Sequence, residues 1–270
     1  MDRTEIASAS DGFKIFEVDG NELRREPDIL AEPLLDLIGT NACVLAREYL
    51  SLSEAGALRQ AAVDLACRQA ARWVPYRING PDFYHYDAND EKDDSRRLAE
   101  NRPLRPRRFR ITKFMPWNQN SEAFETSTRA VIALRNALNG NPREFGIQPE
   151  HGVFTIPQII HYECGGDFLG AHTDMDFTGR QGLSARIAIL TLLSSKGIDF
   201  QNGGLFIETS GERLDVDGYA KPGDLAIIDV SCSHGVEPID PKEQKDVTLE
   251  KGRWMMLVPP YKAELHLREN

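Results

Sequence analysis

The chain has 270 residues, of which 41% are hydrophobic and 27% are charged, as in an ordinary soluble globular protein. Its 42 acidic residues outnumber 32 Lys and Arg, and the resulting net charge of −10 argues against general binding to nucleic-acid phosphates. The N-terminal stretch has no apolar run long enough for a membrane span or secretory signal, and the four cysteines lack Cys-X-X-Cys spacing, so we expect a cytoplasmic protein without a disulfide framework or zinc ribbon.

Two helices are predicted in the first half of the chain. Ser51 is followed three residues later by Glu54, a capping box that opens a helix running to about Val74. Its apolar face carries residues at steps of three or four: Leu58, Ala62, Leu65, Gln69 and Trp73. Residues 121–139 have the same helical spacing of apolar side chains. The earlier segment 27–39 packs an N-terminal element against the core, but its pattern leaves helix or strand open.

A strongly charged region separates the two predicted helices. Residues 82–94 are rich in acidic side chains, and seven arginines follow between Arg96 and Arg110. One interpretation is a solvated loop in which these charges pair locally. The other is a substrate site, with arginines holding a carboxylate and Tyr84, His85 and Tyr86 lining a pocket.

The second half of the chain is rich in predicted strands. Short runs of β-branched and aromatic residues are punctuated by Gly, Pro and Asp: VFTIPQIIHY, ARIAILTLLS, GGLFIE, DLAIIDV and RWMMLVPP. We therefore predict an α+β fold in which early helices support a β-sandwich or barrel. The chain is expected to form a single catalytic domain over 1–270, with 1–150 mainly helical and covering the substrate, and 151–262 forming the strand-rich core.

A metal site is predicted from three residues in this half. His172 and Asp174 are separated by one residue, so an extended strand would direct both side chains to one face. A second imidazole from a distant strand, His234, would complete the set. Two histidines and a carboxylate form the facial triad of non-haem Fe(II) oxygenases, which leaves metal positions open.

An ordered series of segments surrounds these ligands: YECGGDFLGAHTD ending at Asp174, RIAILTLL at 186–193, NGGLFIE at 202–208, KPGDLAIID at 221–229, HGVEP from His234, and Arg253. Over roughly residues 155–260 the series resembles the Fe(II)- and 2-oxoglutarate-dependent dioxygenases, including their prolyl-hydroxylase-like branch. The resemblance implies a double-stranded β-helix, or jelly-roll, whose open end holds iron.

The resemblance also implies a site for the cosubstrate. Arg253 is similar to the basic residue that binds the distal carboxylate of 2-oxoglutarate, and Tyr162 to a tyrosine that reaches toward the same molecule. The plant-type branch carries Arg-X-Ser here, whereas this chain reads Arg253-Trp254-Met255. The partner hydroxyl must therefore come from elsewhere, with Tyr162 and Thr191 as the candidates.

The activity implied by the resemblance uses Fe(II), 2-oxoglutarate and O2, and releases succinate and CO2 while a C–H bond is hydroxylated. Asp174 favours oxygenation, because halogenating relatives replace this carboxylate with a small residue. The expected substrate is a small molecule, such as an amino acid derivative or biosynthetic intermediate, and it could carry a carboxylate. We expect neither a nucleic-acid nor a membrane partner, and the sequence leaves the oligomeric state open.

Substrate contacts are expected from the loop after Asp174, where Phe177 would form an apolar wall and Arg180 an anion anchor. Arg186 either pairs with a buried carboxylate as a structural strand residue or projects over the metal to hold substrate. Three alternatives stay open: a protein or peptide hydroxylase, a catalytically silent jelly-roll that binds a ligand, and a zinc hydrolase with the same ligands. The last lacks a motif for its carboxylate base.

Overall fold

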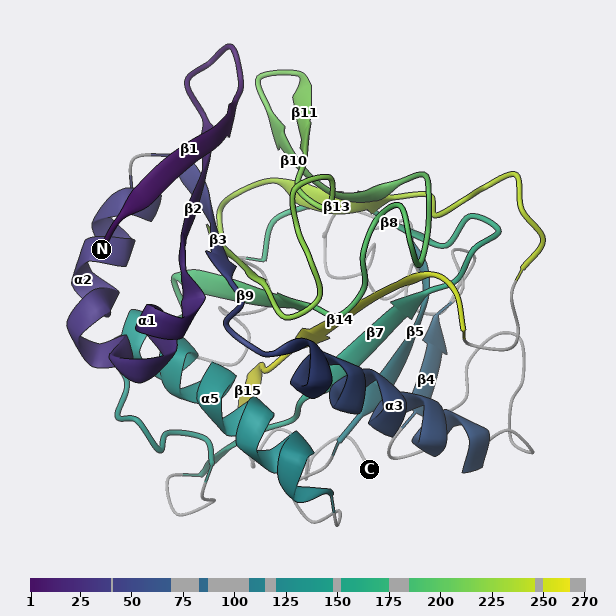
Figure 1. Ribbon diagram of the computed structural model, residues 1–270, viewed down its shortest axis with the longest axis horizontal. Coiled ribbons are helices and arrows are strands. Elements are labelled where there is room, and N and C mark those ends of the chain that lie inside the picture. The colour runs from purple at the N-terminus through teal and green to yellow at the C-terminus, as the bar shows by residue number, and fades with distance from the viewer. Residues whose placement is uncertain are drawn as a thin grey trace, which may run out of the picture.

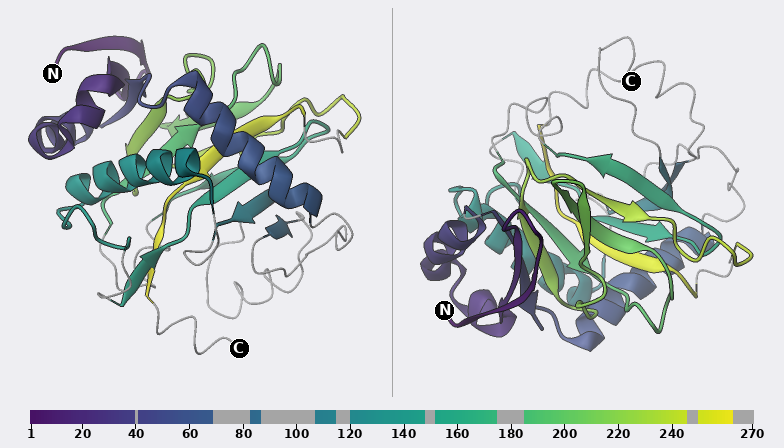
Figure 2. Two further views of the ribbon diagram at one scale, coloured as in Figure 1. Left: turned by 60° about the horizontal axis from the view of Figure 1, so that its bottom comes forward. Right: turned by 90° about the horizontal axis from the view of Figure 1, so that it is seen from above.

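The computed structural model describes residues 1–39, 41–68, 83–86, 107–114, 120–147, 152–174, 185–245 and 250–262, with only the backbone described at 66–68 and 83–86. Two layers of β-strands form the centre of the molecule, and helices cover one outer face (Figures 1 and 2). The strand β5 (Arg107–Lys113) pairs with β7 of one layer and β8 of the other, so it joins the two layers.

The first layer contains, in spatial order, β1 (Arg3–Ser8), β2 (Lys14–Asp19), β3 (Ala42–Arg47), β12 (Leu225–Asp229), β9 (Ile187–Leu192), β14 (Arg253–Leu257) and β7 (Gln158–Tyr162). The second contains β8 (Phe168–His172), β13 (His234–Glu237), β10 (Gly204–Thr209) and β11 (Glu212–Asp215). Outside this order, β4 (Phe83–Tyr86) pairs with β5, and β15 (Pro260–Lys262) pairs with β6 (Val153–Thr155). The predicted jelly-roll core is confirmed.

Alternating side chains of the first layer enter two different cores. Met255 packs between the layers, in a cluster that also contains Leu205 of the second layer. Its neighbour Met256 packs on the other face, in a cluster with residues of the helices. The helices are α2 (Pro27–Ile38), α3 (Leu52–Arg68) and α5 (Glu122–Leu138). This alternation decides which side chains can reach a site between the layers.

The two predicted helices are confirmed at their N-termini. The Ser51 amide donates to the Glu54 carboxylate over 2.8 Å, and the Glu54 amide donates to the Ser51 hydroxyl over 3.2 Å, as a capping box requires. Ser121 caps α5. The expected continuation of α3 through Gln69, Trp73 and Val74 lies outside the described residues. The ambiguous segment 27–39 is largely the helix α2.

The N-terminal region contains more strand than expected. Instead of mainly helical support, β1, β2 and β3 extend the first layer, and the short helix α1 (Gly20–Arg25) and α2 connect the parallel strands β2 and β3. Both faces of β3 are buried, so its sequence shows no polar alternation that would identify a strand. The expected boundary near residue 150, between the supporting part and the strand-rich core, stays a prediction. No helix in the described part of the chain is long and apolar enough to cross a membrane.

Candidate metal centre and buried arginine

Three predicted metal ligands lie together at one end of the interior. Strands β8 and β13 pair antiparallel with His172 directly opposite His234, so the two imidazoles share a face. Asp174 lies two residues beyond the end of β8. One ligand atom from each of the three residues lies within 4.8 Å of the others. The carboxylate oxygens of Asp174 are 3.5 Å from His172 Nε2 and 3.6 Å from His234 Nε2.

Main-chain carbonyls orient both imidazoles. His172 Nδ1 lies 2.9 Å from the carbonyl oxygen of Gly170, and His234 Nδ1 lies 3.0 Å from that of Cys232. Because a carbonyl only accepts, each Nδ1 carries the proton and each Nε2 presents its lone pair to the centre. The Asp174 amide likewise donates to the Val230 carbonyl over 2.9 Å. Both imidazoles are therefore oriented before any metal binds, and the main chain of Asp174 is fixed beside them.

The chemistry of these donors fits ferrous iron. Two neutral imidazoles and one carboxylate match the non-haem Fe(II) triad, and the remaining coordination positions stay available for other ligands. The histidine side chains are only 8% and 5% exposed, whereas Asp174 is 29% exposed. Access to the metal is therefore expected from the carboxylate side.

Arg253 lies in the interior beside Tyr162, as the resemblance implies. The two residues are direct partners on β14 and β7, and the guanidinium carbon lies 5.6 Å from the centre of the tyrosine ring. Arg253 is 1% exposed. Its Nη1 is buried and has no hydrogen-bond partner among the described residues. An unsatisfied buried donor fits a site that receives an anionic group such as the distal carboxylate of 2-oxoglutarate.

Sequence reasoning missed the residue that holds Arg253. Asp217 accepts a hydrogen bond from Arg253 Nε over 2.5 Å and one from Nη2 over 3.3 Å. It lies between β11 and β12, in a stretch (VDGYA) that matches no motif. The one available signal was an acidic residue directly after an apolar one in a short connection, which is too common to identify a site.

The side chains of Thr191 and Arg253 lie on opposite faces of the sheet. Met255 pairs with Leu192 and Met256 with Thr191 across β14 and β9, so Thr191 shares a face with Met256. Arg253, two residues before Met255, points to the opposite face. The prediction that the Thr191 hydroxyl assists Arg253 is therefore corrected by the strand register, which leaves Tyr162 as the hydroxyl on the correct face.

The expected substrate residues are only partly placed. Phe177 and Arg180 lie outside the described residues. Tyr84 and Tyr86 lie on β4, which pairs with β5, and their side chains are not described. The Arg186 side chain is 61% exposed, and its Nε lies 3.4 Å from a carboxylate oxygen of Asp229. The Asp229 side chain is 30% exposed, so this contact is not the predicted pairing with a buried carboxylate, and the role of Arg186 stays a prediction.

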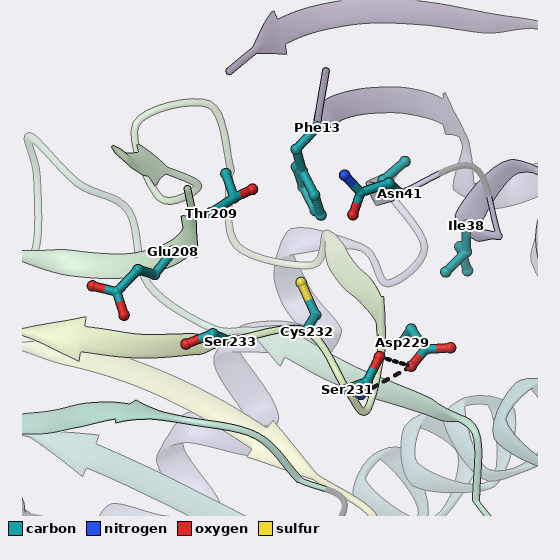
Figure 3. Close-up of a pocket in the computed structure, with 10 residues that line it drawn as sticks. Phe13, Ile38, Asn41, Glu208, Thr209, Asp229, Ser231, Cys232 and Ser233 are labelled. Carbon is teal, nitrogen blue, oxygen red and sulfur yellow. Dashed lines mark hydrogen bonds between the residues drawn. The ribbon is translucent and has the colours of Figure 1, made fainter. Parts of the chain in front are cut away.

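A pocket of about 290 Å³ adjoins the loop that positions the metal ligands. Figure 3 shows Phe13, Asn41, Thr209 and Cys232 around the pocket. The Ser231 hydroxyl donates a hydrogen bond to the Asp229 carboxylate. The same loop supplies the carbonyls of Val230 and Cys232 that contact Asp174 and His234. Burial raises the pKa of the Cys232 thiol to about 12, so it is protonated and unreactive at neutral pH.

No protein-family model matches the chain, and neither does any curated protein. Among solved structures, a prolyl hydroxylase from Trichoplax adhaerens in complex with a peptide of hypoxia inducible factor is 14% identical, with 91% of this chain and 95% of that chain covered and a TM-score of 0.54. A Pseudomonas putida prolyl-4-hydroxylase is 16% identical, with coverage of 84% and 97% and a TM-score of 0.49. A full-length Neurospora crassa protein in complex with alpha-KG is 13% identical, with coverage of 95% and 89% and a TM-score of 0.48. The chain therefore has the fold of the Trichoplax adhaerens prolyl hydroxylase.

Proposed function

We propose that the protein is a non-haem Fe(II)- and 2-oxoglutarate-dependent oxygenase that hydroxylates an unactivated C–H bond of a small molecule and releases succinate and CO2. The observation that carries this proposal is the cluster of His172, Asp174 and His234, whose ligand atoms lie within 4.8 Å of one another. Hydrogen bonds from both Nδ1 atoms to carbonyls support this assignment, because they leave both Nε2 atoms available to bind a metal.

The residues present fit both groups that the reaction requires. His172, Asp174 and His234 would hold Fe(II), and Arg253 would hold the distal carboxylate of 2-oxoglutarate through Nη1. Bound together with O2, iron and 2-oxoglutarate supply an oxidant strong enough to attack a C–H bond. The chain contributes the orientation of the ligands, one carboxylate charge that offsets part of the charge of the metal, and a buried interior that excludes water around Arg253.

The pocket beside the metal loop is large enough for a small molecule, but its lining contains none of the three metal ligands. Its volume of about 290 Å³ is close to the lower end of the range found for small-ligand pockets. The lining combines the ring of Phe13 with the amide of Asn41 and the hydroxyl of Thr209. Such a surface would orient a compact molecule that has an apolar body and a few polar groups.

Anaerobic titration with Fe(II), followed by 2-oxoglutarate, tests the proposal. The wild type should bind about one Fe(II) per chain and develop the weak visible charge-transfer band of a chelated keto acid. His172→Ala should lose both signals. Thr191→Val is the matched control, because its side chain faces the helices and not the site. A wild type with no band, and with the same metal content as His172→Ala, would contradict the proposal.

Substrate identity is tested by a panel monitored for succinate. The panel begins with carboxylate-bearing amino acid derivatives and includes a proline-containing peptide as a separate arm. Succinate that requires both iron and a panel member would identify the substrate class and exclude a catalytically silent binding protein. Turnover with the peptide alone would replace the small-molecule proposal with a peptide hydroxylase.

A further inference from the structure

A buried ion pair lies behind the expected cosubstrate site. Arg253 is 1% exposed and Asp217 is 6% exposed, so both charges are removed from water. A buried guanidinium without a counter-charge is costly, and Asp217 compensates it through Nε and Nη2. The pair is therefore neutral before any cosubstrate binds.

Asp217 is itself fixed by the backbone of the second layer. Its Oδ2, the atom that accepts from Arg253 Nε, also accepts from the Leu205 amide over 2.7 Å. Gly204 directly precedes that amide, and a Cβ atom at Gly204 would lie 2.8 Å from Asp217 Oδ2. Gly204 also has a φ of +120°, which L residues rarely adopt. The start of β10 thus leaves room for the carboxylate and holds it in place.

This arrangement determines which part of the guanidinium is available. Asp217 engages the edge formed by Nε and Nη2, and the Tyr162 ring lies close to the guanidinium. Nη1 is left buried and without a hydrogen-bond partner among the residues that the structure describes. A guanidinium held along one edge can rotate little, so Nη1 has a defined direction.

We propose that Asp217 is a positioning residue for cosubstrate recognition. By holding Arg253 through Nε and Nη2, it directs Nη1 toward the distal carboxylate of 2-oxoglutarate. This inference rests on the proposed function. Because the ion pair is already neutral, the distal carboxylate is recognised through an oriented hydrogen bond more than through net charge. Asp217 thereby favours keto acids with a second carboxylate over those without one.

The test measures ligand affinity and not turnover. Fe(II)-loaded protein is titrated anaerobically in a calorimeter with 2-oxoglutarate and, separately, with 2-oxobutyrate, which has the keto-acid group but no distal carboxylate. Asp217→Asn should weaken 2-oxoglutarate binding about tenfold and leave 2-oxobutyrate binding unchanged. Asp224→Asn is the matched control, since Asp224 is also buried and paired with an arginine, Arg47, but does not contact Arg253. It should change neither affinity.

Asp217→Glu distinguishes the effect of the position of the carboxylate from the effect of its charge. It also provides a test if Asp217→Asn does not fold. It keeps the negative charge but displaces the carboxylate by one methylene, so it should also lose affinity for 2-oxoglutarate selectively. Unchanged or tighter 2-oxoglutarate binding in both variants would overturn the proposal, and tighter binding would identify Asp217 as a competing anion. Equal losses for both keto acids would also overturn it, because they indicate a general structural defect. Absence of 2-oxoglutarate binding by the wild type would instead contradict the proposed function.

Discussion

The two ends of the interior are stabilised in different ways. At the end of β8, the imidazoles of His172 and His234 are oriented by main-chain carbonyls. Arg253 lies opposite Tyr162, the last residue of β7, and a turn connects Tyr162 to the beginning of β8. Here the side chain of Asp217 orients Arg253. Main-chain contacts persist when neighbouring side chains change, whereas a side-chain contact is lost by one substitution. We therefore expect substitutions that shift the backbone to disturb the metal ligands, and substitutions of a single side chain to disturb Arg253.

Arg253→Met should produce the largest loss of stability, because it leaves the buried Asp217 carboxylate without its partner. We expect the free energy of unfolding to fall by about 3–5 kcal/mol. Urea unfolding measures the loss, and the double variant Arg253→Met, Asp217→Leu should recover most of it. Fe(II) binding should persist in folded Arg253→Met, since the metal ligands are held elsewhere. A loss of metal equal to that of His172→Ala would show that the two ends do not behave independently.

Gly235→Ala should damage the metal end through the backbone. The added Cβ would lie 2.6 Å from the Leu169 carbonyl oxygen and 2.7 Å from the Phe206 ring, so β13 must shift against its neighbours. Because His234 directly precedes Gly235, we expect weaker Fe(II) binding and a loss of about 1–3 kcal/mol in stability. Metal titration and urea unfolding measure the two effects.

Gly56→Ala is the control for this substitution, because nothing lies within 4 Å of its added Cβ and its helix should gain stability. Unchanged Fe(II) affinity in Gly235→Ala would contradict the role of the β13 backbone in positioning His234.

Glu54→Gln should have the smallest effect and should spare both ends. Hydrogen bonds from Arg24, and further ones from Ser51, lower the pKa of the Glu54 carboxyl from its ordinary value of 4.5 to about 2. A carboxyl with a lowered pKa in the folded state contributes stability above its unfolded pKa, and this contribution disappears as pH falls from about 4.5 to about 2.

The free energy of unfolding of the variant should therefore be lower by under about 1 kcal/mol near neutral pH. It should also change less with pH between about 4.5 and about 2. Urea unfolding across the acid range tests this expectation, with Fe(II) titration at neutral pH as the control. An unchanged acid dependence would contradict the assigned role of the Arg24–Glu54 pair.

Much of the core and the metal ligand set could be predicted from sequence. Short apolar runs between Gly, Pro and Asp indicated the strands of the second half, and the spacing of His172 and Asp174 indicated a shared site. Long-range register was not available, and it decides the face on which a strand residue lies. The sequence therefore allowed Thr191 as a partner for Arg253, whereas the pairing of β9 with β14 places its side chain on the face of the sheet that the helices cover. Asp217 was missed because a connection between strands carries no periodic signal.

The strands at the two ends of the spatial order, β1 and β11, also affect behaviour in solution. Unpaired backbone groups along an edge strand are templates for association with another chain. Here β1 carries Arg3 and Glu5, and β11 carries Glu212, Arg213 and Asp215. Charged side chains at such positions disfavour edge-to-edge pairing, because a second strand would bury them against its own backbone. The added N-terminal strands thus widen the sheet while keeping its new edge protected against aggregation.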